Sequence, residues 1–120
     1  MVTLGGVGMN KIYNIKIKIA RKDYTCIRCK SKIEPKSEYA YIRTYIVNRK
    51  AYYDTTKSYR MCIKCIKDIL DEFVRSKFGY PVFVSNGSKI LEVKSVDELI
   101  DLAREYTVSF GLCSGFRIKP

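Results

Sequence analysis

The chain of 120 residues contains no histidine, no tryptophan and no glutamine. The lack of histidine excludes zinc fingers of the Cys2His2 type, histidine-based catalytic triads and histidine-ligated metal nucleases. It also removes the imidazole group on which much acid–base catalysis near neutral pH relies. No apolar run approaches the roughly 18 residues that a membrane-spanning helix needs. Residues 1–8 lack the basic start and apolar stretch of a signal peptide, so we expect residues 1–10 to be a flexible leader.

Four of the five cysteines form two Cys-x-x-Cys pairs, Cys26 with Cys29 and Cys62 with Cys65. This spacing places two thiolates on one metal ion, and residues 30–61 are long enough for a hairpin that brings the pairs together. We therefore predict one structural Zn²⁺ held by all four thiolates. An intracellular, cytoplasmic location is expected, and its reducing conditions favour metal binding over disulfides. A thiol–disulfide pair and an iron ion in the same geometry are the alternatives.

The fifth cysteine, Cys113, stands apart from these pairs. A lone cysteine is usually a small buried hydrophobic residue, and a nucleophilic cysteine would need a base that no histidine supplies here. Four thiolates around one zinc leave no position for an activated water molecule. We therefore expect no enzymatic activity.

The net charge of +11 is confined to one half of the chain. Residues 1–65 hold 15 Lys and Arg against 4 Asp and Glu, whereas residues 66–120 hold 8 of each kind. A one-sided positive charge suggests a polyanionic partner, DNA or RNA, and suits a membrane surface less well. The alternative is that the lysines only keep the protein in solution, as on many thermophile surfaces.

Hydrophobic periodicity predicts an α+β fold. Residues 11–20 alternate between apolar and polar side chains as a strand does, and their lysine side is consistent with a charged edge strand. Further strands are expected at 38–47, 51–61, 80–85 and 89–94, with short ones at 107–110 and 115–118. Helices are expected at 62–78, from a stripe that includes Ile66, Ile69 and Phe78, and after the capping box of Ser95 and Glu98. We assign residues 11–79 to a zinc-stabilised module and residues 80–120 to a small hairpin–helix unit that is separate or shares its core.

The order of knuckle (the tight turn around the first cysteine pair), hairpin and helix resembles the treble-clef zinc finger. The matching residues are Cys26-x2-Cys29-x3-Ile33, Tyr39 in the hairpin, and Cys62-x2-Cys65 at the start of the helix. Residues 26–35 are also similar to the start of a zinc protein of the large ribosomal subunit. The resemblance implies a treble-clef-like module with structural zinc, and the missing histidines separate the chain from the nuclease branch. The composition resembles that of small proteins of hyperthermophilic archaea or their viruses.

The predicted hairpin combines tyrosines with cations. Aromatic rings can stack on exposed bases while Lys and Arg bind phosphates, although tyrosine is also a common strand residue. We predict nucleic-acid contacts from Arg28, Lys30, Lys32, Tyr41, Arg43, Tyr45, Arg49, Lys50, Lys57 and Arg60. The expected function is that of a zinc-binding regulatory or accessory protein of nucleic acids. The alternative is a protein–protein adaptor or an oligomerising structural module without a nucleic-acid role.

Overall fold

The computed structural model describes residues 9–48, 57–111 and 115–119, with the side chains of 9–11, 45–48 and 119 left aside. It is a mixed α+β structure, which confirms the predicted fold class. The elements in chain order are β2 (Met9–Ile19), β3 (Tyr24–Thr25), β4 (Lys32–Ile33), β5 (Glu38–Asn48), β6 (Lys57–Cys62), α1 (Ile63–Lys77), β7 (Val82–Ser85), β8 (Ile90–Val93), α2 (Val96–Glu105), β9 (Thr107–Gly111) and β10 (Phe116–Lys119).

One seven-stranded sheet runs through the described parts of the chain, in the order β6-β5-β2-β9-β10-β7-β8. Neighbouring strands are antiparallel except β10 and β7, which are parallel. The expectation that residues 11–20 form an edge strand is wrong, because β2 lies between β5 and β9. The division of the chain near residue 79 stays a prediction; strands from both sides of it join this sheet.

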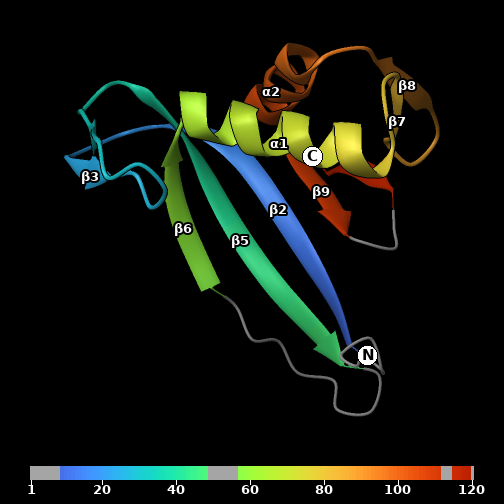
Figure 1. The fold of residues 1–120 in the computed structure, drawn as a ribbon, viewed down its shortest axis with the longest axis horizontal. Coiled ribbons are helices and arrows are strands. Elements are labelled where there is room, and N and C mark those ends of the chain that lie inside the picture. Colours follow the sequence, from blue (N-terminus) through green and yellow to red (C-terminus); the bar gives the residue numbers. More distant parts are fainter. Residues whose placement is uncertain (1–8, 49–56, 112–114, 120) are drawn as a thin grey trace.

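Both helices pack against the same face of the sheet (Figure 1). Phe73 of α1 contacts Phe110 and Phe116, whose ring centroids lie 5.1 and 6.3 Å away. Arg104 of α2 forms an ion pair with Glu38, with 2.9 Å between Nε and Oε2, and Glu38 shares its side of β5 with the buried Ala40. The long β2–β5 pair extends well beyond the helices (Figure 1).

The amphipathic patterns predict the helices well but overestimate the width of the buried stripe. In α1 the buried residues are Cys65, Ile66, Leu70 and Val74, whereas Ile69 is 38% exposed and Phe78, which caps the helix, is 47% exposed. In α2 one half of the predicted capping box is present, since the Glu98 N–H donates to Ser95 Oγ at 3.4 Å. The Glu98 carboxylate accepts from the N–H of Lys94 rather than from that of Ser95. No helix among the described residues is long and apolar enough to cross a membrane.

Truncating Ile66 should cost far more stability than truncating Ile69 one turn later. Ile66 is 1% exposed, so Ile66→Ala leaves a cavity and should lower the free energy of unfolding by about 2–5 kcal/mol. The matched control Ile69→Ala should cost about 1 kcal/mol or less. Urea unfolding of the metal-loaded protein measures both changes, and equal losses would contradict this packing of α1.

Candidate metal centre and cationic sheet face

The four paired cysteines meet where the knuckle, β6 and α1 join. Cys26 and Cys29 lie in the loop between β3 and β4, Cys62 ends β6 and caps α1, and Cys65 lies in the first helical turn. Their four sulfur atoms lie within 4.8 Å of one another. Cys26 and Cys65 are buried, while Cys29 is exposed and Cys62 is half-buried. All four are free thiols in the structure.

The sulfur geometry suits a metal ion better than a disulfide. The Sγ atoms of Cys29 and Cys62 are 3.8 Å apart. A disulfide requires about 2.05 Å between sulfurs. In a tetrahedral site with metal–sulfur bonds of about 2.3 Å, the sulfurs are about 3.8 Å apart. The four cysteines can therefore hold one metal ion, as predicted from their spacing.

Backbone hydrogen bonds fix the knuckle and tie it to the sheet. The N–H of Cys26 donates to the carbonyl of Ser31 at 2.9 Å, and the N–H of Lys30 donates to the carbonyl of Cys26 at 3.0 Å. Lys30 adopts the left-handed conformation, with φ of 67°, which allows this tight turn. The N–H of Ile27 donates to the carbonyl of Arg60 at 2.9 Å. This last bond joins the first cysteine pair to the strand that ends in the second.

The surroundings of the thiols push their pKa values in opposite directions. Hydrogen bonds from the side chain and backbone of Ser31 lower the pKa of Cys29 to about 6. Burial alone would raise the pKa of Cys26, but the backbone N–H groups of Cys29, Cys62 and Arg28 together lower it. Burial raises the pKa of Cys62 to about 12, and the neighbouring sulfurs add to that rise. The surroundings of Cys26 and Cys29 thus favour the thiolate form that a metal requires, whereas those of Cys62 favour the protonated thiol.

Arg28 balances the negative charge of this cluster. Its pKa is raised, chiefly by a hydrogen bond with the sulfur of Cys65 and also by the charges of Cys65 and Asp68. Its Nη1 lies 3.5 Å from Oδ2 of Asp68 on α1. Among the predicted nucleic-acid contacts, Arg28 is therefore the one that lies against the metal centre.

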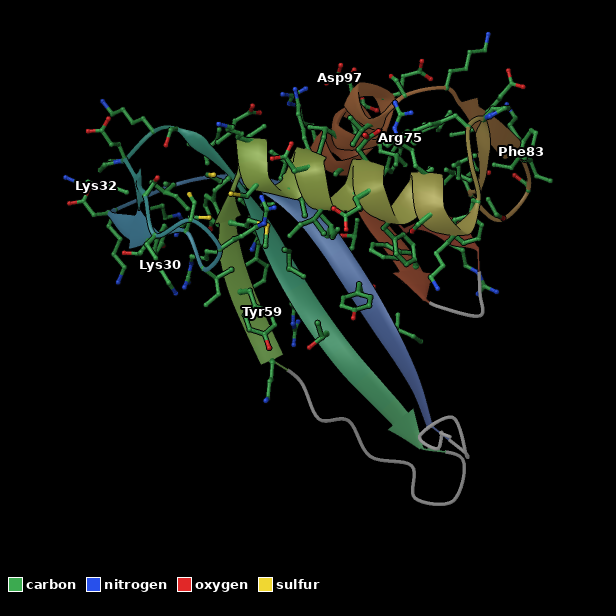
Figure 2. The ribbon with its side chains drawn as sticks, in the orientation of Figure 1. Lys30, Lys32, Tyr59, Arg75, Phe83 and Asp97 are labelled. Carbon is green, nitrogen blue, oxygen red and sulfur yellow. The ribbon has the colours of Figure 1, made fainter. Side chains whose placement is uncertain are left out.

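The remaining predicted contacts are scattered. Lys30 and Lys32 project from the knuckle at the end of the molecule away from Phe83 (Figure 2), and Lys32 lies 3.6 Å from Asp23 in an ion pair. Tyr41, Arg43 and Arg60 lie on the sheet face opposite the helices, by the β5–β6 register. Lys57 pairs with the buried Thr44 and shares the helix-covered side. The side chains of Tyr45, Arg49 and Lys50 lie outside the described residues.

Within the described ranges, the face opposite the helices gathers five cations, of which the sequence-based prediction missed Lys16, Lys18 and Arg117. Strand register places Lys16, Lys18, Arg43, Arg60 and Arg117 on this side of β2, β5, β6 and β10. We call this the cationic face. No Asp or Glu of the described residues lies on it across β6, β5, β2, β9 and β10. The apolar–polar alternation of residues 11–20 is the sequence signal for the lysines of this face. By itself, the alternation indicates only that lysines protect a sheet edge.

Comparisons of the chain with protein-family models, with curated proteins and with solved structures find no match.

Loss of any one paired cysteine should abolish high-affinity metal binding. We expect one Co²⁺ per chain, with the intense visible absorption of tetrahedral thiolate coordination, and its loss in Cys26→Ser or Cys62→Ser. Cys113→Ser is the matched control and should keep both stoichiometry and spectrum. A spectrum that survives Cys62→Ser would contradict the four-sulfur site.

Metal affinity should rise with pH. Because the pKa of Cys62 is raised to about 12, its proton must leave when the metal binds, whereas Cys29, with a pKa of about 6, is already ionised above neutrality. The apparent Zn²⁺ affinity should therefore increase at least tenfold per pH unit between about pH 7 and 9. Competition with a chelator, corrected for its own protonation, measures this slope. A flat profile would show that Cys62 does not bind the metal as a thiolate.

Proposed function

We propose that this chain is a nucleic-acid-binding protein whose cationic face contacts the polyanion, with a structural zinc ion in the four-cysteine site. The observation that carries the proposal is the asymmetry of the sheet. One face is covered by helices and apolar, and the other presents Lys18, Arg43, Arg60 and Arg117 without a carboxylate in the described part of β6, β5, β2, β9 and β10. The fifth cation, Lys16, donates from Nζ to the carbonyl of Arg104 on α2 at 3.1 Å.

Electrostatics favours a polyanion over a small anionic ligand. The cations come from four different strands, so their charge is spread over a surface rather than focused on a point. Each strand spacing adds about 4.8 Å, and a surface of this kind can contact several phosphates at once. The pKa of Tyr41 is lowered, chiefly by its hydrogen bond with Ser58. The positive charges of Arg43, Lys18 and Arg60 lower this pKa further, which is the effect of a positive local field.

The proposed role of zinc is structural. Four protein thiolates complete a tetrahedral shell, and such a site contributes folding energy rather than catalysis. The order of knuckle, β5–β6 hairpin and α1 with its second cysteine pair supports a treble-clef-like module. Reducing conditions inside the cell, the expected location, would keep the four thiols free to bind a metal, and zinc is proposed because closed four-cysteine sites are typical of structural zinc. The proposal includes no enzymatic activity.

Protein docking is the second candidate function. Phe83 of β7 and Ile90 of β8 are 58% and 71% exposed and lie on the same face at the end of the sheet. They border a hollow of about 710 Å³ together with Arg117. Exposed apolar groups at a sheet edge are typical of interaction surfaces. The affinity of this surface for a protein partner would depend little on salt concentration.

Neutralising the cationic face should weaken nucleic-acid binding and its dependence on salt. We expect Arg43→Gln with Arg117→Gln to reduce affinity for labelled oligonucleotides by roughly tenfold. The slope of log affinity against log salt should fall by about 0.7 to 0.9 for each phosphate that the variant no longer neutralises. Fluorescence anisotropy across a salt series, with duplex DNA, single-stranded DNA and RNA, measures both quantities.

The control for this experiment is Lys77→Gln with Lys89→Gln, which removes the same charge from exposed positions on α1 and on the β7–β8 turn. It should leave the affinity and the slope nearly unchanged. Equal effects of the two double variants would mean that only net charge matters. No binding by the unaltered protein would reject the proposed function and favour the docking alternative.

A further inference from the structure

A hollow of about 720 Å³ opens on the cationic face at the end nearest the cysteines. Its lining includes the cations Lys18, Arg21 and Arg60 and the rings of Tyr24 and Tyr41. The three cations are exposed, and the two rings are half-buried. The hollow therefore combines exposed positive groups with half-buried aromatic walls.

The aromatic rings of this hollow are already covered by cations. Lys18 Nζ lies 4.2 Å from the centroid of the Tyr41 ring, and Arg60 Cζ lies 4.1 Å from that of Tyr24. Arg60 also lies 5.9 Å from the Tyr41 ring. A ring face that carries a cation is not open to a stacked base. The geometry thus differs from the sequence-based idea that tyrosines of this hairpin stack on bases.

The cations of the hollow keep their charge available. None of Lys18, Arg21 and Arg60 forms an ion pair within the described residues. Asp23, two residues after Arg21, is engaged with Lys32. Glu38, which pairs with Ile19 in the β2–β5 register, is engaged with Arg104. Lys18 and Arg60 lie around one ring, so both can reach the phosphates of a single strand.

The hollow is built from the segments that carry the metal ligands. Tyr24 lies two residues before Cys26, and Arg60 lies two residues before Cys62. The Ile27 N–H bond to the Arg60 carbonyl joins the two segments directly. The Tyr24 ring also packs against the buried Tyr39, with 5.3 Å between centroids. These contacts hold the Arg60–Tyr24 pair in place.

We propose that this hollow binds the phosphodiester groups of a nucleic-acid strand through Lys18, Arg21 and Arg60, without reading the bases. Tyr24 and Tyr41 are positioning residues that hold Arg60 and Lys18 by cation–π contact. This inference rests on the proposed function and specifies which chemical group of the nucleic acid the site recognises.

The deciding experiment compares a single-stranded oligonucleotide with an abasic strand of the same length. Because phosphates carry the recognition, the metal-loaded protein should bind the two with affinities within about threefold. Abasic binding more than about tenfold weaker would overturn the inference, because bases would then supply the affinity. Binding to neither strand would also overturn the inference, whereas the proposed function would fall only if duplex DNA and RNA were not bound either, so the two failures are distinguishable.

Variants test the roles of the side chains. Arg60→Gln and Lys18→Gln should each lower the salt slope by about 0.7 on single strands. Tyr24→Phe keeps the ring and should bind normally, whereas Tyr24→Leu should weaken binding about two- to fivefold and reduce the slope. Weaker binding by Tyr24→Leu with an unchanged salt slope would indicate that Tyr24 stacks on a base, and it would contradict the positioning role. The Co²⁺ spectrum of each variant verifies that the metal centre is intact.

Discussion

The structure depends on the meeting of four cysteine sulfurs at one junction. A chain of this size has a modest core, and a metal that links its segments adds stability that burial alone supplies with difficulty. The two cysteine pairs close the long hairpin of β5 and β6 at its base. They also fix where β6 ends and α1 begins, since Cys62 belongs to the strand and caps the helix. The junction of β6 and α1 at Cys62 therefore sets the direction in which α1 crosses the sheet.

The one-sided covering of the sheet has direct electrostatic consequences. Because α1 and α2 lie on the same side, all seven strands contribute apolar residues to one core, and no helix of the described residues covers the opposite side. Charged residues on the helix side mostly pair with one another, as Arg104 does with Glu38 and Lys67 with Asp97. On the cationic face of β6, β5, β2, β9 and β10, no Asp or Glu of the described residues lies among the cations; Glu92 of β8, on the same side of the sheet, pairs with Lys94 at 3.8 Å. A surface that repels itself is stabilised by an anionic partner.

Short sequence patterns predicted the structural features that depend only on residues adjacent in the sequence. The cysteine spacing, the strand over residues 11–20, the N-cap at Ser95 and the start of α1 at Cys62 each follow from a few adjacent residues. The place of β2 in the middle of the sheet could not be predicted in this way, because it requires β9 from the far end of the chain to pair beside it. The exposure of Ile69 and Phe78 depends on how much of α1 the sheet covers, which periodicity does not specify. The central place of β2 also changes the meaning of its lysines. In an edge strand, outward lysines prevent association with other strands, whereas a central strand is already paired on both sides.

The alternation that buries the core also determines the spacing of the cations. Ile15 and Ile17 are 2% and 6% exposed on the helix side of β2, which forces Lys16 and Lys18 onto the other side. A shift of one residue in strand pairing would place these lysines in the core, so the register is strongly specified. The distance between cations on neighbouring strands is therefore set by hydrophobic packing on the opposite face. The charges do not need to be ordered by the ligand, which lowers the entropic cost of binding it.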